Sequence, residues 1–327
     1  MRSSSRAVGL ALGFAADWYF ADPRRGHPVA GFGRVADGLR RALYADSRPV
    51  GAAYTGLLVG GAAALGIAAE RATARRPLAG AALTAAATWT VLGGTSLRRE
   101  AATIGDSLGA GDLAAARDRL PHLCGRDPRG LDADQIARAV VESVAENTSD
   151  AVVAPLLWGA VAGIPGLLAY RAANTLDAMV GYRNTKYRNF GWASARLDDA
   201  LNWLPARFTG AVTVAAAPAV GGNPLHTLRV LRRDGASHPS PNAGRCEASA
   251  AGALGVRLGG TNTYGKVVEH RPVMGVGRAP RVADIQRAAV LSGTVGAAAA
   301  VAAAWLAGVG GLRRGQELLR RRELRRR

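Results

Sequence analysis

Long apolar stretches alternate with charged ones along this chain. Four stretches, each about 20 residues or longer, contain no charged side chain; they are residues 50–69, 77–97, 151–170 and 288–312. A helix needs about 20 apolar residues to cross the hydrocarbon core of a bilayer, so each stretch predicts a membrane-spanning helix. Residues 7–16 and 208–222 are shorter, weaker candidates. The pattern predicts an all-α, polytopic integral membrane protein with about five transmembrane helices and helical polar loops.

Prolines and glycines modify this picture. Pro155 and Pro165 could break the stretch 151–170 into a re-entrant pair, and Pro218 could do the same near 208–222. Gly56 and Gly60 have the spacing of small residues that lets two helices approach closely in lipid. The stretches are rich in Ala and Gly, so a soluble protein with buried helices is the alternative. Four such stretches are hard to bury in one soluble domain of this length.

The composition fits closely packed helices better than a β-rich core, because 49% of residues are hydrophobic but only 6% are aromatic. The formal net charge is +18, which could indicate nucleic acid, anionic lipid or anionic small substrates as partners. The basic residues are spread through every polar segment, and no nucleic-acid-binding motif occurs, so we expect no nucleic-acid partner. The Arg-rich tail, residues 313–327, is expected to be cytoplasmic. The other loops are also basic, so the charges do not fix the topology.

Cysteine and histidine chemistry is sparse. Cys124 and Cys246 are the only cysteines, too few for a disulfide framework or a four-ligand zinc site. The five histidines are scattered and match no metal-ligand spacing. Residues 1–16 resemble a signal peptide, but the apolar run continues directly into a polar motif, so we expect it to be retained.

Four polar segments lie within what we interpret as a single membrane-embedded domain, residues 1–327; they cover 17–49, 126–150, 171–207 and 223–287. In the second, Asp132 or Asp134 can cap a helix. Steps of four residues then place four charged side chains along one face of that helix, namely Arg138, Glu142, Glu146 and Asp150. Such a stripe can hold magnesium on ATP phosphates, or it can be a solvated face with an Arg138–Glu142 pair.

The third segment combines Asp, Asn, Arg and Lys with Tyr and Trp, which is costly beside an apolar span unless the polar groups face a cavity or one another. It suits a large planar ligand that bears anions, or interfacial anchoring. The fourth contains Gly259, Gly260 and Gly265, which permit close approach of the backbone to a ligand, but no P-loop pattern.

These segments, in this order, resemble the adenosylcobinamide-phosphate synthase family, also called CobD/CbiB. The similar blocks are Asp22–Val29, Ala137–Leu157, Tyr170–Asn184, Ala195–Arg207, His238–Gly244 and Glu247–Gly260. The ENTSD block and the NTLDAMVGYRN block favour this family over AmpE, a family of membrane proteins to which the chain has a shorter resemblance.

The resemblance implies a multi-pass protein of the bacterial inner (cell) membrane that acts late in cobalamin biosynthesis. It implies a ligase that joins adenosylcobyric acid to aminopropanol or its O-phosphate. ATP would be the co-substrate, magnesium the metal and the corrinoid a substrate rather than a prosthetic group. The lipid bilayer and other corrinoid-pathway enzymes are the further partners expected.

The matching blocks supply the candidate residues, and general chemistry supplies their roles. Amide formation through an acyl phosphate needs magnesium, anion stabilisation and exclusion of water. The expected catalytic residues are Glu142, Glu146, Asp150, Asp177 and His27, of which Glu142, Glu146 and Asp150 are the magnesium candidates. Substrate or ATP binding is expected of Asp22, Asn147, Arg171, Asn174, Arg183, Lys186, Arg196, Asp198, Asp199, Arg207, Asn242 and Glu247. A single site requires these segments to converge on one pocket.

Two rival functions remain open at this point. One is a non-enzymatic membrane protein, either a scaffold for corrinoid enzymes or an AmpE-like sensor. The other is a transporter, because charged groups within a membrane also mark substrate paths.

Overall fold

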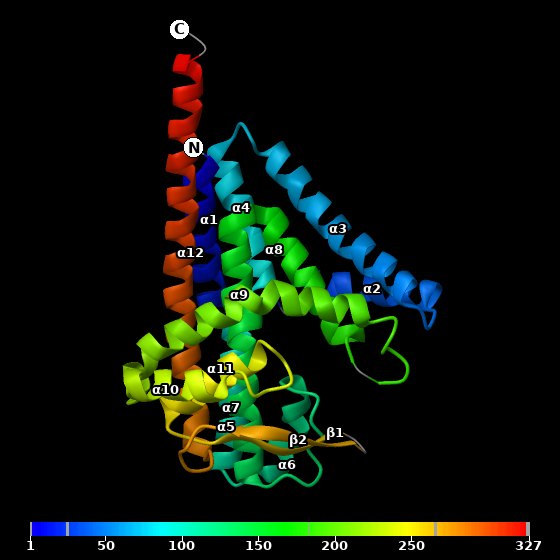
Figure 1. Cartoon of the computed structure of the whole chain (residues 1–327), viewed down its shortest axis with the longest axis vertical. Helices are drawn as coiled ribbons and strands as arrows, with labels where there is room; N and C mark the ends of the chain where they lie inside the picture. The colour runs from blue at the N-terminus through cyan, green and yellow to red at the C-terminus, as the bar shows by residue number, and fades with distance from the viewer. Residues whose placement is uncertain (1, 24–25, 183, 265–266, 325–327) are drawn as a thin grey trace. The chain divides into compact units, whose positions relative to one another are not determined.

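The computed structural model describes residues 2–23, 26–182, 184–264 and 267–324. The predicted all-α class is confirmed, with one addition, an antiparallel hairpin of two short strands. The α-helices in chain order are α1 (Arg2–Phe20), α2 (Pro28–Leu43), α3 (Arg48–Ala72), α4 (Pro77–Val91), α5 (Gly94–Gly109), α6 (Leu113–Arg119), α7 (Ala133–Thr148), α8 (Ala154–Val180), α9 (Trp192–Ala216), α10 (Pro224–Asp234), α11 (Ala243–Leu254) and α12 (Val282–Leu324) (Figure 1). The remaining elements are the 3-10 turns η1 (Leu120–His122) and η3 (Ala217–Val220), the π-helical turn η2 (Ser149–Val153), and strands β1 (Leu258–Tyr264) and β2 (Val267–Met274).

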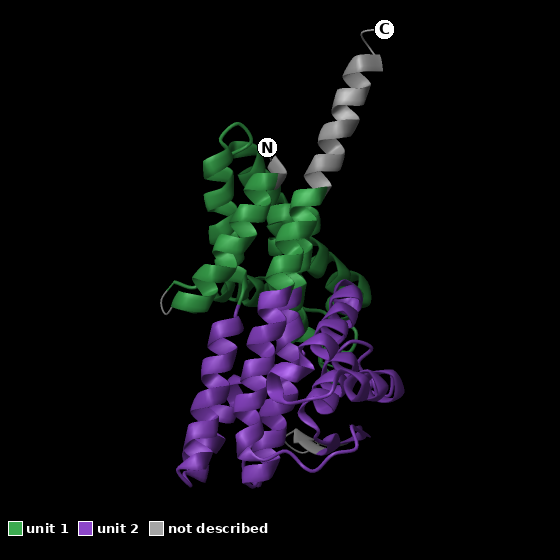
Figure 2. Ribbon diagram, turned by 90° about the vertical axis from the view of Figure 1, so that its left-hand side faces the viewer, with its two compact units in different colours: residues 1–92, 154–200, 299–327 green, residues 93–153, 201–298 purple. Residues whose placement is uncertain are grey.

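The chain forms two compact units (Figure 2). Unit 1 contains Met1–Leu92, Ala154–Ala200 and Ala299–Arg327, and unit 2 contains Gly93–Val153 and Leu201–Ala298. Helices α9 and α12 each contribute residues to both units. The interpretation of residues 1–327 as a single domain stays a prediction.

Three helical stretches among the described residues are long and apolar enough to cross a membrane. They are Arg48–Ala72, Ala133–Val180 and Val282–Val309. They contain three of the four strongly predicted stretches, 50–69, 151–170 and most of 288–312. The three stretches are consistent with a membrane protein, although they are fewer than the five transmembrane helices predicted.

The fourth strongly predicted stretch, 77–97, does not form one helix. Helix α4 ends at Val91, Leu92 has extended backbone angles, and α5 begins only at Gly94. The pair Gly93-Gly94 interrupts the helix because glycine loses more conformational freedom in a helix than any other residue does. The weaker candidates 7–16 and 208–222 lie mostly in α1 and α9, neither of which is both long and apolar enough to span.

Small residues bring α1 and α4 together in unit 1, at positions other than those predicted. A Cβ atom added to Gly9 would lie 2.5 Å from Cβ of Thr84, and one on Gly13 would lie 2.4 Å from Cβ of Thr88. Gly9 and Gly13 therefore provide the close helix contact typical of small residues four apart. Gly56 and Gly60, which have the same spacing, have open space beside them.

Helix α8 reverses direction at Gly163. The backbone angles of Gly163 are φ 70° and ψ −148°, a combination essentially restricted to glycine. After the reversal, a Cβ on Gly166 would lie 2.3 Å from the carbonyl oxygen of Trp158, so the two halves run side by side. The predicted break of 151–170 is thus confirmed, and it lies two residues before Pro165.

Two charged side chains stabilise this reversal. The Arg6 guanidinium donates to the carbonyl oxygens of Ala160 and Val161, at 3.3 and 3.2 Å, where the first half of α8 ends. The Glu70 carboxylate accepts the N–H of Ile164 at 3.1 Å, where the second half begins. A cation at a helix C-terminus and an anion at an N-terminus are each favourable, and the two side chains also pair at 3.4 Å.

In unit 2, the π-helical turn η2 follows from Pro155. Proline has no N–H to donate to the carbonyl oxygen four residues earlier, that of Ala151. That oxygen instead accepts the backbone N–H of Gly93 at 3.2 Å. The turn is wider than an α-helical one, so the regular four-residue repeat of α7 ends before Asp150.

Candidate functional site

Helix α7 provides the centre of the candidate site in unit 2. Asp132 caps it, accepting the N–H of Gln135, and the Gln135 side chain accepts the N–H of Asp132 in return. This confirms one of the two predicted caps and fixes the start of the helix. Ten residues on from the cap, the α7 side chain of Glu142 is buried.

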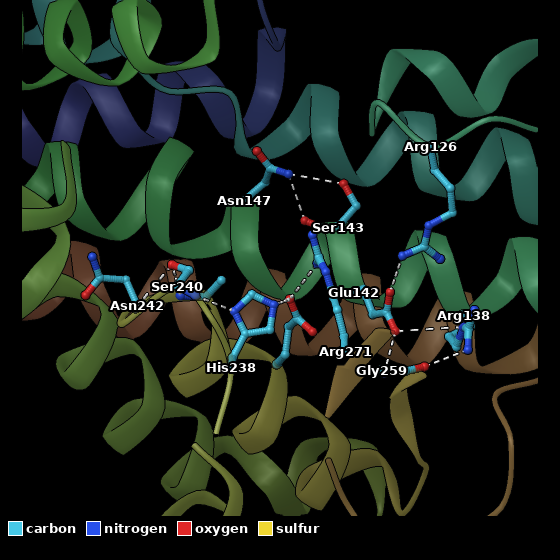
Figure 3. Close-up of polar contacts among 12 residues, drawn as sticks. Arg126, Arg138, Glu142, Ser143, Asn147, His238, Ser240, Asn242, Gly259 and Arg271 are labelled. Atoms are coloured by element: carbon cyan, nitrogen blue, oxygen red, sulfur yellow. Dashed lines mark hydrogen bonds and ion pairs between the residues drawn. The ribbon is translucent and has the colours of Figure 1, made fainter. Parts of the chain in front are cut away.

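Glu142 is enclosed by partners (Figure 3). One carboxylate oxygen accepts from the Arg126 guanidinium at 2.5 Å, and the other accepts the backbone N–H of Gly259 at 2.7 Å. Arg126 is itself buried. A buried ion pair of this kind is tolerated because each charge is paired and hydrogen-bonded. Glu142 therefore joins α7 to the loop before it and to the start of β1.

Arg138 forms the predicted ion pair with Glu142, but only at long range, and its hydrogen bonds go elsewhere. Its guanidinium donates to the carbonyl oxygens of Gly259 and Thr261, at 2.6 and 2.8 Å, and its Nε is 3.9 Å from Glu142. Gly259 and Gly260 have φ angles of 87° and 91°, and a bulge interrupts the strand register there. The predicted glycine-rich turn thus brings backbone close to side chains of α7.

A second buried carboxylate, Glu247 on α11, lies next to the imidazole of His238 and the guanidinium of Arg271. It is 1% exposed, and neither of its oxygens has a hydrogen-bond partner among the described residues. Nε2 of His238 is 3.8 Å away and Nη1 of Arg271 is 4.0 Å away, both beyond hydrogen-bond range. Burial raises the pKa of Glu247 well above its usual value, and the charges of Glu142 and Glu146 raise it further.

The orientation of His238 is fixed by backbone. Nδ1 accepts the N–H of Ser240 at 3.0 Å, so in the neutral ring the proton is on Nε2, the atom nearest Glu247. Ser240 Oγ in turn accepts the N–H of Ala243 at 3.2 Å, at the start of α11. The loop before α11 thereby places the imidazole, which is labelled in Figure 3, 3.8 Å from the Glu247 carboxylate.

The other predicted residues of unit 2 surround this cluster. Glu146 and Asp150 are half-buried, and Asn147 donates to the carbonyl and hydroxyl oxygens of Ser143, at 2.9 and 3.1 Å. Asn242 is buried, with its side-chain oxygen 3.5 Å from Arg207. Burial lowers the pKa of Arg207, and the charge of Arg245 lowers it further.

The predicted magnesium group is not assembled from three carboxylates. Among the described residues, no three His, Cys, Asp or Glu side chains converge as a metal-binding group. Glu142 is occupied by Arg126 and Gly259, and Asp150 lies in the π-helical turn. A magnesium ion on nucleotide phosphates needs only one or two protein carboxylates.

The remaining predicted residues belong to unit 1. His27 caps α2, with Nδ1 accepting the N–H of Val29 at 3.1 Å, and Asp22 is half-buried nearby in sequence. Asn174 donates to Asp198 at 3.2 Å, which brings α8 and α9 together. Arg171 lines a cavity described below.

Several of the unit 1 residues are at the surface or near it. Arg196 and Asp199 form an ion pair of 3.8 Å along α9, and Asp177 is half-buried on the last turn of α8. Lys186 is exposed and lies over the rings of Tyr44 and Tyr187. Arg183 lies outside the described residues. The single pocket predicted for all these residues combines both units and stays a prediction.

Sequence reasoning missed three residues of the unit 2 cluster: Arg126, His238 and Arg271. Arg126 and His238 lie inside or beside blocks that were noticed, yet no local spacing connects either to its partner carboxylate. Their signal is burial of a charge, which becomes visible only when distant segments pack.

Most of the chain matches known proteins. Residues 10–292 match the family model described as CobD/Cbib protein. The chain is 54% identical over 303 residues to the cobalamin biosynthesis protein CobD of Mycobacterium tuberculosis, covering 92% of this chain and 96% of the relative. It is 47% identical over 265 residues to the protein of that name from Geobacter metallireducens, covering 79% and 83%. No solved structure matches.

Proposed function

The chain belongs to the CobD/Cbib protein family, and from that premise we propose that it is an ATP-dependent ligase of cobalamin biosynthesis. The reaction proposed is amide formation between adenosylcobyric acid and aminopropanol or its O-phosphate, at the membrane of the cell. The observation that supports a catalytic role most directly is the buried group of carboxylates and cations in unit 2, all of it within the matched residues 10–292.

The chemistry proposed requires two group transfers. The substrate carboxylate attacks the γ-phosphorus of ATP, giving an acyl phosphate and releasing ADP. The amine nitrogen then attacks the acyl carbon, phosphate leaves, and the proton lost from nitrogen passes to a base. Both steps develop negative charge on oxygen, which cationic side chains stabilise best where water is excluded.

The unit 2 cluster offers groups suited to these tasks. Arg126 and Arg271 are guanidinium groups beside buried carboxylates, and Arg207 stands at the edge of the cluster near Asn242. Guanidinium groups match phosphate and carboxylate geometry. Magnesium, if held on the ATP phosphates, would supply charge neutralisation there, with Glu146 as the protein ligand that fits best. These roles are part of the proposal.

The test is a direct assay of product. Detergent-solubilised protein is incubated with adenosylcobyric acid, ATP, magnesium and either aminopropanol or its O-phosphate, and products are identified by mass. The proposal expects a corrinoid heavier by the amine minus one water, formed together with ADP, and only when ATP is present. Absence of this product with both amines, from protein shown to be folded, would overturn the ligase and favour a non-catalytic role in the pathway.

A further inference from the structure

A cavity in unit 1 lies among α2, α3, α4 and α8. Its volume is about 320 Å³. Its lining includes Phe32, Leu57, Gly61, Leu65, Leu168 and Arg171. Almost all of the lining is aliphatic or aromatic, and Arg171 is the one charged residue among the lining residues described.

The wall formed by α3 is open toward the outside of unit 1. Leu57 and Leu65 are 61% and 65% exposed although both line the cavity. They are eight residues apart, so the wall extends about 12 Å along the helix. A Cβ added to Gly61, halfway between them, would meet no atom within 4 Å.

We propose that this cavity binds one acyl chain of an anionic phospholipid, with the lipid phosphate beside Arg171. The proposal concerns lipid recognition and goes beyond the ligase reaction.

The lining chemistry selects this class of ligand. A ligand with many amide or hydroxyl groups would bury them against carbon, at a cost for each unpaired group. The other polar lining residue, Thr90, already donates its hydroxyl to the carbonyl oxygen of Ala87 at 3.0 Å. An unbranched hydrocarbon chain needs no partner, and each buried methylene is favourable.

The position of the opening indicates where the bound acyl chain comes from. The exposed wall belongs to Arg48–Ala72, one of the three helical stretches in the described part of the chain that are long and apolar enough to cross a membrane. A cavity that opens along such a helix is open to hydrocarbon rather than to water when the helix is in a bilayer. Arg171 adds a positive charge to the lining of the cavity, and cationic side chains attract the phosphate of an anionic lipid.

Two leucine substitutions on adjacent residues of α3 give a matched test. Gly61→Leu places a side chain in the cavity, whereas Gly60→Leu adds the same side chain at a neighbouring glycine that does not line it. Neither position has an atom within 4 Å of an added Cβ, and leucine favours a helix more than glycine does. Both variants are therefore expected to fold, which thermal unfolding in detergent verifies. Ala62→Leu, at another lining residue, is the second cavity-filling variant.

The measurement is lipid retention by native mass spectrometry after exchange of the purified protein into detergent with defined lipids. Phosphatidylglycerol and phosphatidylcholine with identical acyl chains are compared, and inorganic phosphate is added in a separate arm. We expect one phosphatidylglycerol to be retained by the unsubstituted protein and by Gly60→Leu, and about tenfold weaker retention by Gly61→Leu, because about two methylenes lose their contacts. Arg171→Gln is expected to reduce the preference for phosphatidylglycerol over phosphatidylcholine about fivefold.

Each contrary outcome is decisive. Equal retention by Gly61→Leu, Ala62→Leu and Gly60→Leu would overturn the cavity as the binding site. Equal retention of the two lipids by the unsubstituted protein, or displacement of phosphatidylglycerol by inorganic phosphate, would overturn the anionic lipid as the ligand. No ATP or corrinoid is present, so the result is independent of the ligase proposal.

Discussion

The Glu142 carboxylate on α7 accepts the backbone N–H of Gly259 at 2.7 Å, across 117 residues of sequence. The same carboxylate accepts from Arg126 at 2.5 Å, and both side chains are buried. One acidic side chain thus connects the loop before α7, the helix itself and the start of the β-hairpin. Its first role is to hold these three segments together.

Replacing Glu142 with Gln should therefore destabilise unit 2. The amide oxygen can still accept from Gly259, but Arg126 is left as a buried charge without its counter-ion, at a cost of about 3 kcal/mol. The double variant Arg126→Met/Glu142→Gln should be more stable than Glu142→Gln alone by about 2 kcal/mol, because the orphan charge is gone. Chemical denaturation in detergent measures both. If the destabilisations of the single variants Arg126→Met and Glu142→Gln simply add in the double variant, the buried pair is contradicted.

Replacing Gly163 with Ala should disrupt the reversal of α8. The added Cβ would be 2.0 Å from the Glu70 carboxylate, and the backbone angles strongly disfavour any residue but glycine. The expected loss is about 3 kcal/mol, seen as a lower unfolding midpoint. Gly31→Ala is the control, because that glycine lies in α2 with open space beside it. It should be neutral or stabilise by up to about 1 kcal/mol. Equal effects of the two substitutions would contradict the strained reversal.

The elements that sequence predicted correctly are those whose causes are local. The Asp132 cap needs only Gln135 three residues on, and the break near Pro165 needs only the proline and Gly163. The prediction of one helix over the apolar run 77–97 was wrong because hydropathy carries no information on where a helix ends. Here the flexible backbone of Gly93-Gly94 ends it. The β-hairpin was missed because its pairing depends on the bulge at Gly259, which side chains of α7 support.

In the candidate site, too, contacts between distant segments could not be predicted from local sequence. A four-residue step predicts that Arg138 pairs with Glu142, and that ion pair is present but long, at 3.9 Å. The hydrogen bonds of Arg138 go to strand carbonyl oxygens, and the short contact with Glu142 is made by Arg126. The stripe would have continued to Asp150 if Pro155 had not induced the π-helical turn. Family resemblance identified Glu247 as a site residue, but only packing reveals that His238 and Arg271 flank it.

Stability should depend on pH through Glu247 in a specific direction. Its folded-state pKa is raised above the ordinary 4.5 by burial, and by the charges of Glu142 and Glu146, against the opposing charges of Arg271 and Arg126. The folded protein thus binds this proton more tightly than the unfolded chain does. The stability from the neutral acid is fully present below about pH 4.5 and is lost as pH rises through the folded-state pKa. Glu247→Gln, which mimics the neutral acid, should therefore become increasingly stabilising relative to the unsubstituted protein as pH rises above about 4.5 toward the folded-state pKa.

Glu100 provides a control of opposite sign. Although burial opposes the change, hydrogen bonds from Arg119 and His122 lower its pKa below the ordinary 4.5. Glu100→Gln should cost about 1 kcal/mol at neutral pH, and the cost should vanish as pH falls through the folded-state pKa. Unfolding midpoints of the two variants from about pH 3 to about pH 8, each relative to the unsubstituted protein, test both. Parallel pH profiles for the two substitutions would show that burial does not raise the pKa of Glu247.

Glu146→Gln should abolish amide formation while leaving the fold intact. Glu146 is half-buried on α7, and its charge acts on Glu247. If Glu146 acts on the reacting groups or on the metal of the nucleotide, kcat and kcat/KM should fall together by at least about 100-fold.

The matched control for Glu146→Gln is Asp134→Asn, an exposed acid on the first turn of the same helix. It removes one negative charge from α7 without altering the buried cluster, so its rate should stay near that of the unsubstituted protein. Thermal unfolding is measured on both variants, so that a loss of rate can be separated from a loss of folded protein. A Glu146→Gln protein that forms product at the normal rate would remove Glu146 from the mechanism. An equal loss of rate in both variants would point instead to the net charge of α7.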